Sequence, residues 1–339
     1  MSADSTPTVD FHAHALIEPV EELVRDHPQR AAELTQQLQW QGEASARHNL
    51  ELFASSYMQA LTSLEHRLVA MDAMGVDVQA VSLSPTQYYY WADRDLADRI
   101  VRTANGGIAE LCARAPQRLV GLATVSLQHP DLAADQLTHA VRELGLRGVQ
   151  ISTRVDNSEL DDPRFAPLWG AAEALGAVIF IHPLGCTLGT RLASHYLSNV
   201  VGQPLETTVA LSHLICGGVL ERHPALHVCA AHGGGYLPQY IGRTDHAAEV
   251  RPECTVPDRP SSYLGRIFYD SLVYDAMTLR HLIERVGPSQ VVLGTDYPFD
   301  MGVSDPLARL DAVPGLDESR RREIRGATAA RLLKLPGHG

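Results

Sequence analysis

Near its start the chain reads Val9-Asp10-Phe11-His12-Ala13-His14, an apolar run that ends in two histidines. Three later runs also carry a potential metal ligand or base where a hydrophobic strand would end. They read Val178-Ile179-Phe180-Ile181-His182-Pro183, Val228-Cys229-Ala230-Ala231-His232-Gly233 and Val291-Val292-Leu293-Gly294-Thr295-Asp296. Because these segments lie far apart in the sequence, only a fold that gathers strand ends on one face brings them together. A parallel (β/α)8 barrel does this, since its active site is built at the carboxyl ends of its strands.

Strand-like and helix-like patterns alternate along the whole chain. The predicted strands lie near 8–13, 76–83, 118–127, 146–152, 177–182, 226–231, 266–273 and 290–295. The predicted helices cover 64–74, 93–115, 131–144, 163–175, 205–222, 234–248, 275–286 and 317–334. Such alternation favours parallel βα units, and eight of them close a barrel. We therefore predict an α/β fold, a TIM barrel, with residues 1–339 as a single domain.

Two connections are too long for simple loops between a strand and a helix. Residues 15–60 leave the first strand and include a polar helical run from Glu21 to Leu38, and residues 183–204 form a long loop after the fifth strand. Both emerge on the predicted catalytic face. We interpret 15–60 as a helical insertion that acts as a lid, and 183–204 as a pocket wall. The alternative for both is a peripheral decoration.

Composition excludes several classes of protein. The formal charge is −12, from 28 Lys and Arg against 40 Asp and Glu, so nucleic acid is not an expected partner. Neither a signal-peptide pattern nor an apolar run that would span a bilayer is present, so we expect a soluble, cytoplasmic protein. Five scattered cysteines without CxxC spacing are expected to be reduced and mostly buried. They are Cys112, Cys186, Cys216, Cys229 and Cys254.

The spacing of His12 and His14 suits one bound cation. Residues two apart on a strand point to the same side of the pleat, so both imidazoles can bind one ion. His182 and Asp296 add ligands at the ends of the fifth and eighth strands. Three imidazoles and a carboxylate suit Zn²⁺ with one position open for water, although Mn²⁺ and Fe²⁺ accept the same ligands. Singly, His182 and Asp296 also fit structural roles beside their prolines; together the four positions favour one mononuclear site.

His232 opens a glycine run, residues 233–235, between the sixth strand and a helix. Glycine amides at a helix N-terminus form a site that favours anions. At a strand end that faces the metal, we expect His232 to act as the general acid/base, exchanging a proton with metal-activated water or with substrate. The alternative is a buried histidine bound to the turn.

Four consecutive aromatic residues follow the second strand on the same face. They are Tyr88, Tyr89, Tyr90 and Trp91. They are expected to form a wall for a flat, unsaturated substrate, and a packing cluster under a loop is an equal alternative.

Taken in order, these motifs resemble the amidohydrolase superfamily, in particular the branch that contains 2-amino-3-carboxymuconate-6-semialdehyde decarboxylase. The resemblance covers nearly the whole chain and also uses residues 71–79, Ile241-Gly242-Arg243 and 294–298. It implies that His12, His14, His182 and Asp296 bind one zinc ion and that His232 activates the metal-bound water. It further implies a homodimer in which Arg243 reaches a substrate carboxylate across the interface, whereas a surface salt bridge is the alternative for that arginine.

The sequence also departs from that pattern. A gapless count back from Met71-Asp72 places Ser55 where the family decarboxylase has a second carboxylate-binding arginine, and Arg47 replaces it only if the insertion is rearranged. Related binuclear barrels bridge two metals with a modified lysine or a glutamate at the end of strand four, where this chain has Ser152-Thr153. The leading hypothesis is therefore a mononuclear, non-oxidative decarboxylase of a related aromatic or dienoic acid. Its rivals are a hydrolase or hydratase that uses the same metal water, and a non-catalytic metal-binding protein.

Overall fold

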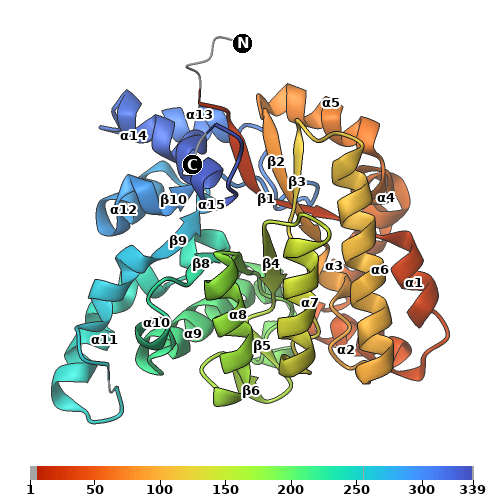
Figure 1. Ribbon diagram of the computed structural model, residues 1–339, viewed down its shortest axis with the longest axis horizontal. Helices are drawn as coiled ribbons and strands as arrows, with labels where there is room; N and C mark the ends of the chain where they lie inside the picture. The colour runs from red at the N-terminus through yellow and green to blue at the C-terminus, as the bar shows by residue number, and fades with distance from the viewer. Residues whose placement is uncertain (1–5, 255, 338–339) are drawn as a thin grey trace.

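The computed structural model describes residues 6–254 and 256–337, so the outermost ends of the predicted domain lie outside the described residues. In this part of the chain eight parallel strands form a closed barrel (Figure 1). The strands are β1 (Val9–Ala15), β2 (Val78–Leu83), β3 (Leu119–Gly121), β4 (Gly148–Ile151), β7 (Val178–Ile181), β8 (His227–Ala230), β9 (Ile267–Asp270) and β10 (Val291–Val292). Two bridges, Ala13 to Tyr297 and Ala123 to Val149, join the sheet β1-β2-β3 to the sheet β10-β9-β8-β7-β4. The predicted barrel is confirmed.

Helices cover the outside of the barrel close to the predicted ranges. They are α5 (Leu64–Met74), α6 (Arg94–Ala113), α7 (Pro130–Arg142), α8 (Ala166–Leu175), α9 (Gln203–Cys216), α10 (Val219–Arg222), α11 (Leu237–Val250), α12 (Ala276–Val286), α14 (Glu318–Arg322) and α15 (Thr328–Leu332). The predicted helix 205–222 is broken at Gly217-Gly218, where Gly218 has a φ of 72°. The structure also contains α13 (Pro306–Asp311) and a small hairpin of β5 (Arg154–Val155) and β6 (Ser158–Glu159), which the sequence did not predict. No helix among the described residues is long and apolar enough to cross a membrane.

The strands are buried on both faces, as expected for a parallel sheet covered by helices. On β7, Ile179 and Ile181 belong to the core shared with the surrounding helices, whereas Val178 and Phe180 belong to a second cluster with residues of β1, β8 and α15. The Phe180 ring meets the Phe11 ring edge to face at 5.5 Å between centroids. This apolar layer supports the strand ends above it.

Strand β1 contains an irregularity that the sequence pattern did not reveal. Its pairing with β2 matches Asp10 to Gln79 and Ala13 to Val81, so Phe11 and His12 together face the single residue Ala80. Such a bulge changes which side of the strand a residue faces. Strict alternation would place Asp10 on the same side as His12, but the bulge separates them.

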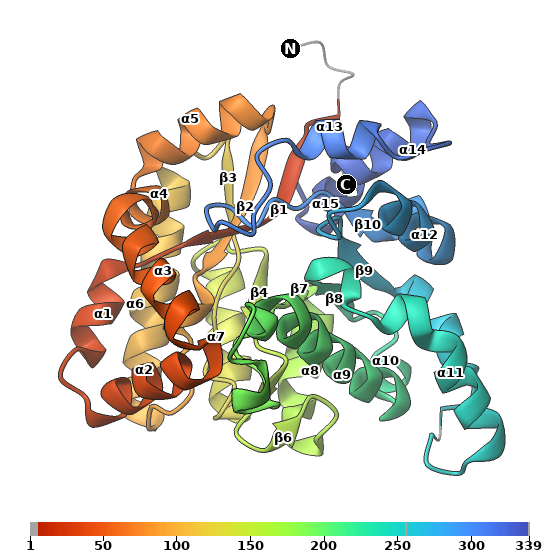
Figure 2. The same cartoon turned by 180° about the vertical axis from the view of Figure 1, so that it is seen from behind.

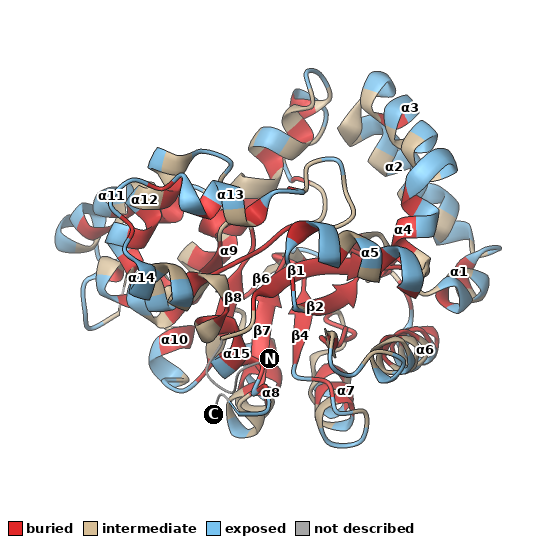
Figure 3. Ribbon diagram, turned by 90° about the horizontal axis from the view of Figure 1, so that it is seen from above, coloured by how far each residue is buried: buried red, intermediate tan, exposed pale blue. Residues whose placement is uncertain are grey.

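The insertion after β1 is helical, as predicted. It contains α1 (Glu18–Val24), α2 (Pro28–Gln41), α3 (Glu43–Leu52), a π-helical turn (Phe53–Tyr57) and α4 (Met58–Thr62). No residue of α2 is buried and α3 buries only Ala46, so this pair is largely exposed (Figure 3). Helix α2 packs on the 3-10 turn Gly189–Leu192 of the loop after β7 (Figure 2). Whether the insertion moves as a lid stays a prediction.

Candidate metal centre

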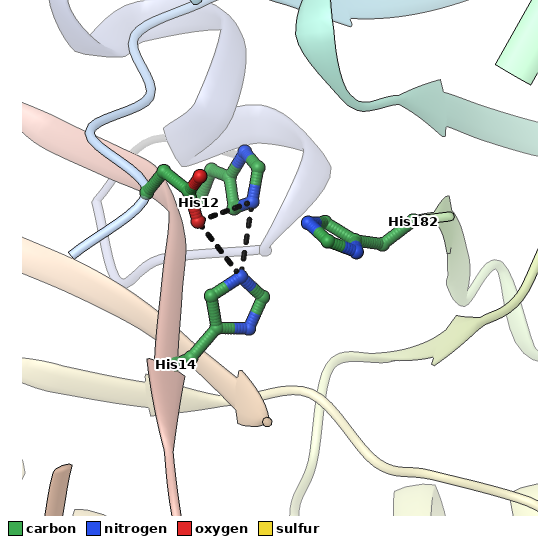
Figure 4. Close-up of side chains that lie close together, drawn as sticks. His12, His14 and His182 are labelled. Carbon is green, nitrogen blue, oxygen red and sulfur yellow. Dashed lines mark hydrogen bonds and ion pairs between the residues drawn. The ribbon is translucent and has the colours of Figure 1, made fainter. Parts of the chain in front are cut away.

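The four predicted ligands converge at the carboxyl ends of the strands. His12 and His14 lie on β1, His182 directly follows β7, and Asp296 follows β10. One ligand atom from each residue lies within 4.8 Å of all the others, and all four residues are buried. Figure 4 shows the rings of His12, His14 and His182 turned toward one another. The predicted convergence of these residues is confirmed.

Each imidazole is oriented by a partner at its far nitrogen. His12 Nδ1 lies 2.7 Å from Asp270 Oδ2, and His182 Nδ1 lies 2.9 Å from the main-chain oxygen of the next residue. His14 Nδ1 is 3.2 Å from Ser82 Oγ. These partners place the ring proton on Nδ1 and leave Nε2 directed at the centre, which is the arrangement typical of metal-binding histidines.

The ligand atoms at the centre of the cluster lie so close together that they require a positive charge between them. His12 Nε2 and His14 Nε2 are only 3.1 Å apart, and Asp296 Oδ1 lies 3.4 Å and 3.2 Å from them. Two ring nitrogens at this distance need a shared proton or a metal ion between them. His182 Nε2 is buried without a hydrogen-bond partner among the described residues. These residues therefore fit one divalent cation with nitrogen and oxygen ligands.

The electrostatics of the cluster agree with this donor set. Burial and the neighbouring histidines hold the pKa of His182 well below its ordinary value, and burial lowers the pKa of His14. Burial raises the pKa of Asp296, but the nearby histidines outweigh it and the net pKa is lowered. Burial also lowers the pKa of His12, but Asp296 and Asp270 outweigh it and the net pKa is raised. The lowered pKa values of His182, His14 and Asp296 favour the deprotonated forms that a metal ion binds.

Asp270 is a site residue that the sequence reasoning missed. It ends β9, is fully buried, and joins a ligand to the turn after β8. Its Oδ2 pairs with His12, while its Oδ1 accepts hydrogen bonds from the amides of Gly233 at 2.8 Å and Leu272 at 3.1 Å. The sequence did point to Asp270, because it is a carboxylate in the predicted strand 266–273, just as Asp296 is a carboxylate at the end of a predicted strand.

His232 lies beside the ligands. Its ring centroid is 5.5 Å from that of His12 and 5.2 Å from that of His182, and its Nε2 is 4.0 Å from Asp296 Oδ2. Its Nδ1 is buried without a described partner. Burial lowers its pKa, which favours a neutral ring at neutral pH. His232 and the three glycines after it all have positive φ, and a Cβ on Gly235 would lie 2.1 Å from the oxygen of Pro204, so this tight turn requires glycine.

The aromatic run has two faces. Tyr88 and Tyr90 stack at 5.1 Å with 3° between their planes. The Tyr88 hydroxyl donates to the main-chain oxygen of His182 at 3.3 Å, and Tyr90 Oη accepts the amide of Ser152 at 3.2 Å. These two tyrosines therefore lie against the ends of β7 and β4.

Tyr89 and Trp91 face the other way, so for these two residues the structure shows the alternative, a packing cluster, rather than a wall. Tyr89 belongs to a hydrophobic cluster with Val20 and Val24 of α1, and Trp91 packs against that cluster. The Trp91 ring also stacks on His27 at 4.6 Å. The alternation of side chains along the segment, together with the positive φ of 45° at Tyr89, divides the run between the strand ends and the insertion.

Neither arginine predicted to bind substrate is near the four ligands of the same chain. Arg243 is exposed on α11. Arg47 is 68% exposed on α3 and pairs with Glu43 at 2.9 Å. Ser55 is exposed in the π-helical turn and donates to the main-chain oxygen of Leu52.

A sequence model of the family described as amidohydrolase matches residues 9–335. The chain belongs to the amidohydrolase family. A 2-amino-3-carboxymuconate-6-semialdehyde decarboxylase from Dictyostelium discoideum is 36% identical over 272 residues, which cover 79% of this chain and 76% of that protein. The structure of a 2,6-dihydroxybenzoate decarboxylase from Rhizobium is 26% identical, with a TM-score of 0.81, and the match covers 98% of this chain and 99% of that one.

A third similar structure holds a metal. It is a dihydroxybenzoic acid decarboxylase from Polaromonas sp. JS666 with bound manganese and the inhibitor 2-nitroresorcinol, 23% identical, with a TM-score of 0.80 and 98% of both chains covered. At this identity the likeness shows the fold. The Dictyostelium relative and the Rhizobium structure are both named decarboxylases, which supports the predicted class of enzyme, a carbon–carbon lyase, and does not favour the hydrolase alternative.

Proposed function

We propose that this protein is a metal-dependent, non-oxidative decarboxylase of an aromatic or dienoic carboxylic acid. The observation that carries the proposal is a buried set of three imidazoles and a carboxylate, in which His182 Nε2 has no described partner, beside a fourth histidine, in a family whose similar members are named decarboxylases. His12, His14, His182 and Asp296 would hold one ion per chain. We propose Zn²⁺ from the ligand set; Mn²⁺, which the Polaromonas enzyme holds, is the first alternative to test, and Fe²⁺ the second.

A bound divalent cation would supply Lewis-acid stabilisation of negative charge on the substrate. The chain's own residues would deliver the proton that the reaction needs. When the bond to the carboxylate breaks, CO₂ leaves and the electron pair stays on the ring or diene carbon. His232 would take up a proton from solvent and deliver it to that carbon in place of CO₂, assisted by Asp296, whose Oδ2 lies 4.0 Å from His232 Nε2.

The substrate side of the proposal rests on two features. The stacked pair Tyr88 and Tyr90 provides aromatic surface beside His182, which suits a planar acid. Arg243 would orient a carboxylate from the partner subunit of a homodimer. Support comes from the exposed side of α11, where Tyr236 at the N-cap and Tyr240 are 40% and 73% exposed and lie seven and three residues before Arg243. The homodimer, the cytoplasmic location and the single domain stay predictions.

The test is to load the metal-free protein separately with Zn²⁺, Mn²⁺ and Fe²⁺ and to follow CO₂ release without oxygen from hydroxybenzoates and muconate semialdehydes. We expect turnover of at least one acid, and a loss of about 100-fold or more in kcat for His232→Gln with the metal content unchanged. Turnover only of an ester, lactone, amide or alkene would show a hydrolase or hydratase. A His232→Gln variant that matches wild type in every activity found would favour a non-catalytic metal-binding protein.

A further inference from the structure

The segment between β2 and α6 connects the strand ends to the insertion. Tyr88 and Tyr90 contact the ends of β7 and β4, whereas the intervening Tyr89 is turned toward α1. Because Tyr89 holds a φ of 45°, a region that non-glycine residues rarely occupy, its side chain must be fixed by its surroundings. Whatever fixes Tyr89 also sets the position of the two rings beside it.

Glu21 of α1 fixes that side of the segment. Its Oε1 accepts the Tyr89 hydroxyl at 2.5 Å and the Gln87 side-chain amide at 2.8 Å, and its Oε2 lies 3.3 Å from an Arg30 nitrogen. The Arg30 guanidinium in turn lies 5.0 Å from the centre of the Tyr89 ring. Gln87 also exchanges two hydrogen bonds with the main chain of Ile17, at 2.9 Å and 3.1 Å. One carboxylate thus joins α1, α2 and the aromatic segment, through charge-assisted hydrogen bonds.

We infer that Glu21 is a positioning residue that holds the Tyr88–Tyr90 pair in place for the planar acid. The inference rests on the proposed function, because it takes that pair as the substrate's aromatic contact. Glu21 belongs to the insertion, and its bonds run to the outward face of the segment rather than to the ligands. Loss of its acceptor oxygens leaves the Tyr89 hydroxyl without its partner and the Gln87 amide with only its bond to the main chain of Ile17, so the segment relaxes and binding weakens while the ligands and His232 stay in place.

A graded series of variants tests this role through the division between KM and kcat. Glu21→Leu should raise KM about tenfold with kcat within about twofold of wild type, because the segment that carries the Tyr88–Tyr90 pair is no longer held while the ligands and His232 are unchanged. Glu21→Gln keeps an acceptor oxygen and should retain most of the affinity. The matched control is Glu22→Leu, since Glu22 is 70% exposed on the same helix and its ion pair with the exposed Arg25 is long, at 3.9 Å. A KM for Glu21→Leu equal to the control, or a parallel loss of kcat and bound metal, overturns the inference.

Hydrogen exchange separates this inference from the proposed function. The amides of Gln87, Tyr88 and Ala92 bond within the segment, and we expect them to exchange faster in Glu21→Leu and in the milder Tyr89→Phe, but not in Glu22→Leu. If no acid is decarboxylated, the proposed function fails, and exchange together with the affinity for a planar acid still decides the role of Glu21. Unchanged exchange in both variants overturns the positioning role even if the enzyme is active.

Discussion

Asp10 and Asp270 are both fully buried carboxylic acids, but their side chains bond to different residues, on different sides of strand β1. Asp270 contacts a ligand, since its Oδ2 lies 2.7 Å from His12 Nδ1; burial raises its pKa, but His12 outweighs burial and the net pKa is lowered. Asp10 accepts hydrogen bonds from the uncharged Thr295 and Gln79 at 2.6 Å and 2.8 Å, and burial raises its pKa to about 6. Burial alone therefore does not identify a functional carboxylate, whereas its partner does.

The two acids belong to different groups of buried polar residues. We call the group that contains Asp10 the outer layer, and the group that contains Asp270 and the four ligands the inner layer. The outer layer runs from Asp10 through Gln79 to Arg67 of α5, which donates to Gln79 Oε1 at 2.7 Å and to the main-chain oxygen of His14 at 2.6 Å. The fully buried Arg67 has its charge balanced there, and burial lowers its pKa to about 10. The inner layer, in contrast, has at its centre His182 Nε2, which has no partner among the described residues. We expect the outer layer to determine stability and the inner layer to determine metal binding and activity.

The largest effect should come from a change in the inner layer. Asp296→Asn preserves the shape of a ligand but removes its charge, so the protein should lose its metal and about 1,000-fold or more of its activity, because a Lewis acid is worth several kcal/mol. Metal analysis and kcat/KM measure these losses. The metal-free variant should unfold at nearly the same temperature as metal-free wild type, and a fall of more than about 5 °C would contradict the division into layers.

The outer layer should respond in the opposite way. Arg67→Met leaves Gln79 Oε1 and the oxygen of His14 without their donor, and Asp10 without a nearby positive charge. The free energy of unfolding of the metal-free protein should fall by about 3 kcal/mol in urea denaturation. Bound metal should remain at the wild-type ratio. Loss of the metal with an unchanged free energy of unfolding would contradict the assignment of Arg67 to the outer layer.

Asp270→Asn tests whether a carboxylate that contacts a ligand, rather than the metal, affects metal affinity. The asparagine can no longer attract the His12 proton with a full charge, so metal affinity should weaken by roughly 10–100-fold. Competition with a chelator of known affinity measures the change. Asp10→Asn is the matched control, because it alters an equally buried carboxyl two residues from the same ligand. Equal weakening in both variants would erase the distinction between the two acids.

The smallest effect concerns pH. The folded pKa of Asp10, about 6, exceeds the ordinary value of 3.8, so the folded state holds this proton more tightly and the contribution of Asp10 to stability declines as pH rises from about 4 to about 6. One proton gives a slope of at most about 1.4 kcal/mol per pH unit. Asp10→Asn should remove that part of the slope in urea titrations of the metal-free protein. An identical slope in the variant would show that Asp10 is not its source.

The barrel and the four ligands were predictable because both follow from short-range patterns. Apolar runs and their terminal polar residues are legible in the sequence, and the topology brings the ends of parallel strands together. The bulge at Phe11-His12 was not predictable, since it depends on the register with β2 rather than on β1 alone. The position of Arg67 between a helix and the barrel was hidden for a similar reason: on α5 it reads as an ordinary charged residue, and only the tertiary structure buries it.

The aromatic run shows the same limit. Its location after the second strand was correct, but its division into two faces depends on the backbone at Tyr89 and on Glu21, a residue 68 positions away. Asp270, in contrast, could have been predicted in the same way as Asp296, from a carboxylate in a predicted strand.

The most direct test of the central claim is anomalous diffraction from crystals of the metal-loaded protein, with data on both sides of the metal's absorption edge. We expect one strong peak per chain within bonding distance of His12 Nε2, His14 Nε2, His182 Nε2 and an oxygen of Asp296. A peak bound elsewhere, two peaks in the same cluster, or no peak in protein that decarboxylates its acid would contradict it.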